Sequence, residues 1–228
     1  MASCCSPDSY RKLFGRRQAR KDAKRFRRKG LDGTAQRLVD GLAERGVDGA
    51  EVLEVGGGVG AVEIELLRAG AARATIVELS PEYDEEAAAL LREAGLEGRV
   101  ERRIGDFVAD GVPPADVVVM HRVVCCYPDE EALVGAAADH ARRLLALSFP
   151  RNALHLRPIA WAMNQGLRIV FQFRFYMRPP EQVLAPAEAR GFRVVSEHEG
   201  IFWRTAVLER DQPSGSEPGA VSQVKTSA

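Results

Sequence analysis

The chain of 228 residues has no lysine between Lys29 and Lys225. This absence excludes a lysine nucleophile, a lysine Schiff base and a phosphate-binding P-loop lysine from the body of the protein. Cysteine is also scarce and comes as two adjacent pairs, Cys4–Cys5 and Cys125–Cys126. Because neighbouring cysteines rarely bridge each other, we expect free thiols and a cytoplasmic protein.

Long apolar stretches are missing as well. No run approaches the roughly 18 apolar residues that are needed to span a bilayer, and the N-terminus lacks the apolar region of a secretory signal. The hydrophobic fraction of 46% and the charged fraction of 28% are ordinary for a globular protein. The length predicts one domain with enough residues for a substantial core.

The formal net charge of zero conceals a strong asymmetry. Residues 11–29 hold eleven lysines and arginines and one acid, Asp22, so the rest of the chain has a net charge of −10. This basic segment fits a solvated helix, a lid over a bound ligand, or a surface for RNA phosphates. We do not expect nucleic acid as a partner, because no basic groove or stacking platform occurs outside the segment, and RNA methylation is kept only as an alternative.

Strand-like and helix-like patterns alternate through most of the chain. Apolar and β-branched runs predict strands at 51–55, 74–78, 100–104, 116–120, 145–149, 193–198 and 202–209, and helical periodicity predicts helices at 10–30, 32–45, 59–69, 80–95 and 129–144. Such alternation predicts a doubly wound α/β sheet. We expect a basic helical segment at 1–33, a ligand-binding domain at 34–210 and a disordered tail at 211–228.

A glycine cluster after the first predicted strand is the most informative motif. Gly56, Gly58 and Gly60 stand between an apolar run and a helical pattern, and a turn without side chains lets a ligand approach the backbone closely. Gly56, Gly58 and Ala61 fit the dinucleotide fingerprint, which expects an acid about 20 residues further on, where Glu78 stands. A nicotinamide-dependent oxidoreductase is therefore one interpretation.

Three further features favour S-adenosylmethionine over a nicotinamide. Glu54 precedes the glycines, the turn begins about 50 residues into the chain, and Gly105-Asp106-Phe107 follows the third predicted strand. With these motifs the chain resembles the class I S-adenosylmethionine-dependent methyltransferases over roughly residues 34–209. The segment 121–129 is similar to a poorly assigned bacterial branch of these enzymes, and residues 27–30 have a looser likeness to magnesium-protoporphyrin O-methyltransferases.

The resemblance implies a fold and a set of cofactor-binding residues. The fold is a Rossmann-like seven-stranded methyltransferase sheet whose last strand is antiparallel. The implied cofactor residues are Gly56, Gly58 and Gly60 at the methionine part, Glu54 at its ammonium group, Glu78 with Leu79 at the ribose, Asp106 at the adenine amino group, Phe107 on the adenine ring, and His121 after the fourth strand. No Asn-Pro-Pro-Tyr-like tetrad follows that strand, which argues against methylation of planar nucleobase amines.

The segment after the fourth predicted strand holds the candidate catalytic residues. Substrates of open α/β sheets bind beyond the carboxyl ends of the strands, which makes His121 and Tyr127 the candidates. His121 has the pKa range of a general base, but it could instead only bind the cofactor or cap the loop, and Tyr127 could only shape the loop. Alignment of the reactants alone can supply much of the acceleration.

Residues 150–178 interrupt the alternation with aromatic and methionine side chains among five arginines. We expect a helical, aromatic cap over a small-molecule methyl acceptor that is apolar or aromatic and is methylated on oxygen or nitrogen. The alternatives for this insert are a cover for the core, a homodimer interface, or contact with an anionic membrane surface. A cofactor-binding protein without catalysis is the alternative outside enzymes.

We predict no metal site, because no metal-ligand set of the catechol methyltransferase type is found. One alternative brings Cys4–Cys5 over the site to meet Cys125–Cys126, where four thiols would suit a soft metal. The simpler interpretation is that the second pair consists of small packing residues.

Overall fold

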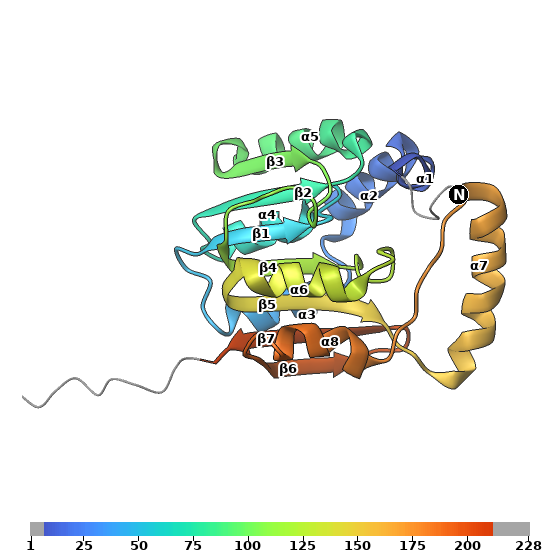
Figure 1. The fold of residues 1–228 in the computed structure, drawn as a ribbon. Helices are drawn as coiled ribbons and strands as arrows, with labels where there is room; N and C mark the ends of the chain where they lie inside the picture. Colours follow the sequence, from blue (N-terminus) through green and yellow to red (C-terminus); the bar gives the residue numbers. More distant parts are fainter. Residues whose placement is uncertain (1–6, 212–228) are drawn as a thin grey trace, which may run out of the picture.

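The computed structural model describes residues 7–211, which form one sheet with helices on both faces (Figure 1). The strands are β1 (Glu51–Val55), β2 (Arg73–Glu78), β3 (Val100–Ile104), β4 (Ala115–His121), β5 (Ala141–Pro150), β6 (Phe192–Glu199) and β7 (Trp203–Arg210). The helices are α1 (Pro7–Leu13), α2 (Arg16–Lys29), α3 (Gly33–Ala43), α4 (Ala61–Arg68), α5 (Asp84–Ala94), α6 (Glu130–His140), α7 (Arg157–Phe171) and α8 (Pro180–Glu188).

The strand order is β3-β2-β1-β4-β5-β7-β6. β1 pairs in parallel with β2 and β4, and β2–β3 and β4–β5 are parallel as well, whereas β7 runs antiparallel to both of its neighbours. The doubly wound, seven-stranded sheet with an antiparallel last strand is therefore confirmed. The order reverses direction between β1 and β4, and ligands of open α/β sheets bind at such a switch point, beyond the carboxyl ends of the strands.

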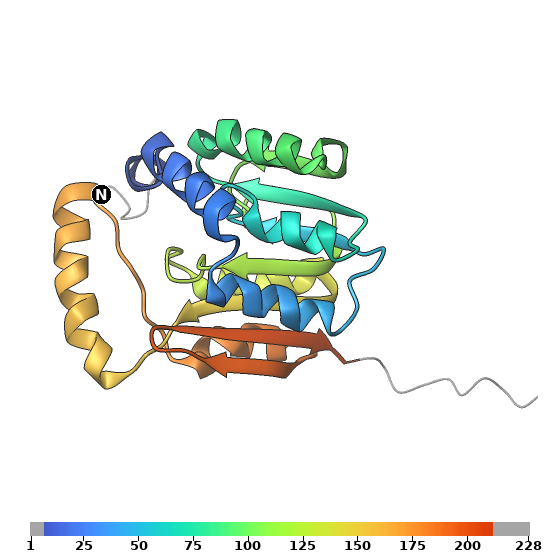
Figure 2. The ribbon, with the colours of Figure 1, turned by 180° about the vertical axis from the view of Figure 1, so that it is seen from behind.

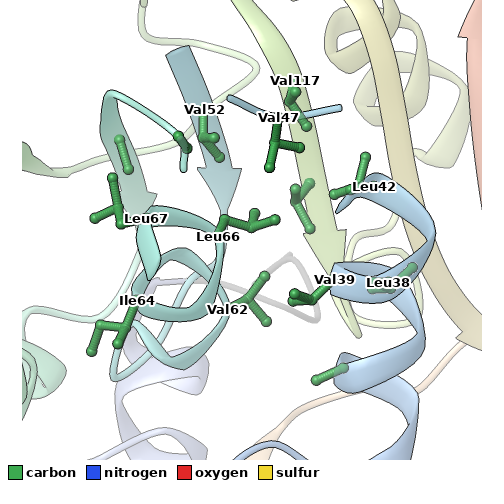
Figure 3. Close-up of a cluster of buried hydrophobic side chains, with 14 of the residues drawn as sticks. Leu38, Val39, Leu42, Val47, Val52, Val62, Ile64, Leu66, Leu67 and Val117 are labelled. Atoms are coloured by element: carbon green, nitrogen blue, oxygen red, sulfur yellow. The ribbon is translucent and has the colours of Figure 1, made fainter. Parts of the chain in front are cut away.

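Successive residues of the central strands face opposite sides of the sheet and enter two separate cores. Val52 and Val117 belong to the core with α3 and α4, and Figure 3 shows Leu42 of α3 and Leu66 of α4 directed toward them. Leu53 and Val118, one position further on, belong to the core under α6 and α8. This alternation is the side-chain period of a strand that is buried on both faces. The two views of Figures 1 and 2 show these two helical layers.

Several element boundaries differ from the sequence-based prediction. The basic N-terminal helix is divided at Gly15 into α1 and α2. α6 ends at His140, and β5 begins at Ala141, inside the predicted helix 129–144, because residues 141–144 pair with β4 on one side and, at Leu144, with β7 on the other. Except for Asp211, the predicted tail at 211–228 lies outside the described residues, as does Cys4–Cys5.

The insert at 150–178 contains α7, which stands at the edge of the molecule toward which the parallel strands point (Figures 1 and 2). The C-terminal end of α7 lies near α1. Just beyond it, the rings of Phe173 and Tyr10 pack edge to face, with their centroids 5.4 Å apart. None of the helices within residues 7–211 is long and apolar enough to cross a membrane. The edge that carries the carboxyl ends of β1, β2 and β4 is thus bordered by the N-terminal helices and α7.

Candidate functional site

A cavity of about 800 Å³ lies at the carboxyl ends of the parallel strands. It brings together all of the cofactor residues that the sequence predicts except Gly60, which lies immediately beyond it at the N-cap of α4. The lining residues from that set are Glu54, Gly56, Gly58, Glu78, Leu79, Asp106, Phe107 and His121, together with Tyr127. Segments far apart in the sequence therefore converge on one site.

The glycine turn forms the floor of this cavity. Gly56 and Gly58 have φ angles of +69° and +55°, in the left-handed region that side chains rarely adopt. A Cβ atom on Gly56 would lie only 2.7 Å from Cγ2 of Val123, in the loop after β4. The glycines are therefore required by the backbone conformation and by the close approach of that loop.

Glu78 connects the end of β2 to the glycine turn. Its carboxylate accepts hydrogen bonds from the backbone N–H groups of Gly58 and Ser80, each at 2.9 Å. Burial raises the pKa of Glu78, while these two donors act in the opposite direction. The carboxylate is thus fixed in orientation at the cavity wall, with Leu79 next to it.

Asp106 and Tyr127 meet at another wall of the cavity. The Tyr127 hydroxyl lies 3.2 Å from both carboxylate oxygens of Asp106, which also accepts the N–H of Val108 at 3.0 Å. Burial and the neighbouring Asp106 raise the pKa of Tyr127 to about 12. Tyr127 therefore stays protonated at neutral pH and acts as a hydrogen-bond donor to Asp106. Phe107 is buried and contacts the ring of His140.

A pair of buried glutamates lies behind the glycine turn. Glu54, at 2% exposure, accepts the backbone N–H of Glu63 at 3.2 Å. Burial and the adjacent Glu63 raise the pKa of Glu54 well above its usual value, and burial raises the pKa of Glu63. Arg102 is the nearby cation and donates to the carbonyl of Gly58 at 3.0 Å. Neither carboxyl oxygen of Glu63 has a hydrogen-bonding partner within residues 7–211.

His121 is held at the cavity between two polar residues that the sequence analysis did not single out. Its Nδ1 lies 3.0 Å from Oγ of Ser148, which also accepts the backbone N–H of Arg122 at 2.9 Å. Its Nε2 lies 3.8 Å from Oδ2 of Asp32, too far for a hydrogen bond. Burial lowers the pKa of His121, although Asp32 acts against this shift. The imidazole is therefore neutral at neutral pH, and its Nε2 remains free to meet a ligand.

Asp32 organises this corner of the site. It caps α3 by accepting the N–H groups of Thr34 and Ala35, and its carboxylate pairs with Arg25 at 3.2 Å and Arg122 at 3.0 Å. Although burial acts to raise it, the pKa of Asp32 is held well below its usual value by the contacts with His121, Ala35 and Arg122. The helix-start pattern at Asp32 signals the cap in the sequence, but its proximity to His121 depends on the fold.

The second wall of the cavity comes from the N-terminal helices and not from the insert. Tyr10, Phe14 and Phe26 line it with their rings, accompanied by basic side chains of α2. No described residue of 150–178 lines the cavity, so the aromatic cap that we expected there is supplied by α1 and α2. The positions of Phe14 and Phe26 in a basic helical segment were the available signal.

The second cysteine pair lies beside the cavity as free thiols. Cys125 is buried, and its Sγ lies 3.5 Å from Sγ of Cys126, which lines the cavity. The contact with Cys125 and burial raise the pKa of Cys126 well above its usual value, so the thiol stays protonated. Among the residues that the structure describes, no cluster of three potential metal ligands is found.

The cavity matches S-adenosylmethionine in size and charge. Its volume of about 800 Å³ lies within the range of small-molecule and cofactor sites. At the glycine turn the cavity is lined by the buried acids Glu54 and Glu78, with Arg102 as the nearby cation, whereas its other basic side chains come from α2 and Arg122. Because burial raises the pKa of both acids, a cationic ligand group at the turn would stabilise their charged forms. A sulfonium and an ammonium group supply that charge, and Glu78 and Asp106 present carboxylates to ribose hydroxyls and an adenine amino group.

Several solved structures with a similar fold are methyltransferases. Magnesium protoporphyrin IX methyltransferase from Synechocystis, with bound S-adenosylhomocysteine, has 22% sequence identity and a TM-score of 0.63 over 82% of this chain and 94% of that one. An O-methyltransferase family protein from Burkholderia thailandensis has 19% identity and a TM-score of 0.62 over 77% of this chain and 56% of that one. An O-methyltransferase family 2 protein from Planctomyces limnophilus, in complex with apigenin, has 20% identity and a TM-score of 0.58 over 80% and 63%.

The sequence itself supplies the assignment. No curated protein matches the chain, but a family described as Methyltransferase domain matches residues 24–197, which include α3, the glycine turn and the sheet up to β6. With the cofactor site at the switch point of the sheet, the chain belongs to this methyltransferase domain family and is an S-adenosylmethionine-dependent methyltransferase of class I.

Proposed function

We propose that the protein transfers a methyl group from S-adenosylmethionine to an oxygen or nitrogen atom of a small acidic molecule with an apolar or aromatic body. The observation that carries this proposal is the continuity of the cavity, in which the cofactor residues and the second wall of α1 and α2 face the same space. The aromatic side chains of that wall suit an apolar or ring-shaped acceptor.

The basic side chains of α2 favour an acceptor with a carboxylate or phosphate. Lys21, Lys24, Arg28 and Lys29 line the cavity, and none of them forms an ion pair within residues 7–211. Other arginines of the same helix are occupied, because Arg27 pairs with Glu93 of α5 at 2.8 Å. The unpaired cations are therefore available to an anionic group, whereas the paired ones hold the helix against the body.

In this proposal the predicted residues divide between cofactor binding and catalysis. S-adenosylmethionine, when bound, supplies an activated methyl group on a sulfonium centre. Glu78 holds the ribose hydroxyls with Leu79 beside it, and Asp106 accepts the adenine amino group while Tyr127 fixes its orientation and Phe107 packs nearby. Gly56, Gly58 and Gly60 admit the methionine part, and Glu54 balances its ammonium charge.

His121 is the proposed general base. Ser148 Oγ accepts the Arg122 N–H and can also accept a proton from Nδ1, which leaves the lone pair of Nε2 for the proton of the methyl acceptor. Asp32, 3.8 Å from Nε2, would stabilise the imidazolium that forms. The lowered pKa of His121 keeps it ready as a neutral base at neutral pH.

Two features support the proposal of a small acceptor in place of RNA and of a cytoplasmic location. Arg16 pairs with Glu82 at 2.8 Å and Arg27 with Glu93 at 2.8 Å, so part of the charge of the basic segment is already balanced by protein acids and is less available to RNA phosphates. On the side of localisation, Cys125 and Cys126 are free thiols, as expected for a reducing compartment.

Transfer of a tritium-labelled methyl group from S-adenosylmethionine tests the proposal. The protein is incubated with a metabolite extract, and label is counted separately in the small-molecule, RNA and protein fractions. We expect label in acidic, apolar small molecules. His121→Asn should lower kcat by about 100-fold, the contribution of a general base, without changing the affinity for S-adenosylhomocysteine. Label in RNA alone, or in no fraction, would contradict the proposal.

A further inference from the structure

The outer face of α7 is the most exposed apolar surface in the described part of the chain that the methyltransferase site does not use. We call it the interfacial face. Its side chains are Ile159, Trp161, Met163, Ile169 and Val170 of α7, with Leu154 of the turn that precedes the helix. Trp161, Ile169 and Val170 are 67%, 82% and 64% exposed. None of the six lines the cavity or belongs to either core. The face therefore contributes neither to the described site nor to the packing of the domain.

Contacts on the opposite side of α7 fix which side faces outward. Ala160 is buried, and the side-chain amide of Asn164 donates to the carbonyl of Phe175 at 2.8 Å and accepts its N–H at 2.7 Å. The chain that returns from α7 is thus bound to the inner side of the helix. Ile169, nine residues after Ala160, lies on the opposite side of the helix and therefore faces outward, while Trp161 and Val170 lie on its two flanks.

The charged residues within the insert are all basic. Residues 150–178 contain five arginines and no aspartate or glutamate. Arg157 and Arg168 are exposed on α7, and neither forms an ion pair within residues 7–211. Two other arginines of the segment are paired with acids outside it, Arg151 with Glu199 at 2.5 Å and Arg178 with Glu130 at 2.6 Å. The exposed apolar side chains and the two unpaired arginines are therefore carried by one helix, α7, which stands at the edge of the molecule (Figure 1).

We propose that α7 docks this protein on an anionic lipid bilayer, with the interfacial face in the headgroup region and Arg157 and Arg168 on lipid phosphates. A helix with an apolar face, a tryptophan and flanking cations suits this position. A second copy of the chain on the same face would bring arginines against arginines, which is unfavourable. Because the cavity opens toward the same edge of the sheet, docking would bring it near amphiphilic molecules in the bilayer.

Vesicle co-sedimentation of the full chain tests this proposal independently of methyl transfer. We expect binding to vesicles that contain one third phosphatidylglycerol, little binding to pure phosphatidylcholine, and weaker binding as salt rises from 50 to 500 mM, conditions chosen to span the screening range. A variant with Trp161→Ser, Ile169→Ser and Val170→Ser should bind at least tenfold more weakly. Its affinity for S-adenosylhomocysteine should be unchanged, which shows that it is folded.

Two controls make the result specific to α7. Ile104→Ser removes an apolar side chain that is 46% exposed at the end of β3 and should leave vesicle binding unchanged. The protein has two tryptophans, and only Trp161 lies on the interfacial face, so its emission should shift to shorter wavelength on binding and the shift should disappear in Trp161→Phe. No binding at low salt, equal binding by the triple variant, or a dimer in solution that the triple variant abolishes would overturn the proposal.

Discussion

Replacing Gly56 by alanine tests whether the glycine turn is shaped for a ligand. Gly56 and Gly95 have nearly equal φ angles, +69° and +68°, but Gly95 ends α5 on the surface. A Cβ on Gly95 meets nothing within 4 Å, whereas a Cβ on Gly56 lies 2.7 Å from Cγ2 of Val123. Gly95→Ala is therefore a matched control that has the same backbone strain without the collision.

The expected magnitudes follow from these two geometries. An alanine whose backbone is held in the left-handed region lowers the free energy of unfolding by about 1–2 kcal/mol, so both variants should lose that amount of stability. Gly56→Ala should lose roughly 1–3 kcal/mol more, since a contact about 1 Å too short forces the Val123 loop to move. With about 2–4 °C per kcal/mol for a chain of this size, thermal unfolding should separate the two variants by several degrees.

Cofactor affinity gives the second measurement, because the displaced Val123 lines the cavity. Calorimetric titration with S-adenosylhomocysteine should show at least tenfold weaker binding by Gly56→Ala, a change of about 1.4 kcal/mol, and unchanged binding by Gly95→Ala. Equal unfolding temperatures and equal affinities of the two variants would refute the reasoning that the Val123 loop closes on the turn.

Three further predictions concern the charged groups of the site. Burial raises the folded-state pKa of Glu63 and Glu54, so the free energy of unfolding should fall as pH rises above their unfolded pKa of about 4.3. Urea unfolding should therefore show that Glu63→Gln is more stable than the unmodified protein by about 1 kcal/mol at pH 8 but not at pH 4. Tyr127→Phe removes the hydroxyl that donates to Asp106 and should raise KM for S-adenosylmethionine about tenfold while kcat stays unchanged. A loss of kcat alone would contradict the role of Tyr127 in orienting Asp106. Asp32→Asn keeps a good helix cap but loses the negative charge. Since the folded-state pKa of Asp32 is lowered, the variant should be less stable than the unmodified protein by about 1 kcal/mol at pH 7. This difference in the free energy of unfolding should vanish as pH falls below about 3.9.

Local sequence patterns were sufficient for the parallel half of the sheet and for the glycine turn. β1 and β3 begin and end where the sequence predicts, at 51–55 and 100–104. β1 is largely apolar, so its local preference agrees with its buried position in the sheet. β3 holds three charged residues between Val100 and Ile104, which suits its place at the edge of the sheet. The cofactor residues follow because they lie at or just beyond the carboxyl ends of strands, and the carboxyl ends of parallel strands meet at one edge.

The boundary between α6 and β5 shows where local patterns fail. Residues 141–144 continue a helical pattern in the sequence, yet they pair with β4, and at Leu144 also with β7. Pairing with strands distant in the sequence outweighs helix propensity, whose contribution per residue is well below 1 kcal/mol for ordinary residues. Such pairing is decided only by the folded chain.

Polar residues that act through distant partners were also missed. Ser148 is a single hydroxyl within an apolar strand, and Glu63 is an acid between buried residues of α4; each was a visible irregularity without an assigned partner. Their partners, His121 and Glu54, lie 27 and 9 residues away in the sequence. A side chain that is out of place in its local pattern is a sign of such a contact, but the pattern does not name the partner.

The sequence by itself determined the fold class, the cofactor and most of the residues that surround it, because these depend on strand and turn patterns that are local in the chain. Only the tertiary structure decided that α1 and α2 supply the second wall of the cavity, that Asp32 and Ser148 hold His121, and that α7 exposes its apolar face. The physical reason is that composition and periodicity show that a helix has an apolar face, whereas the surface that this face meets is set by contacts between segments far apart in the sequence.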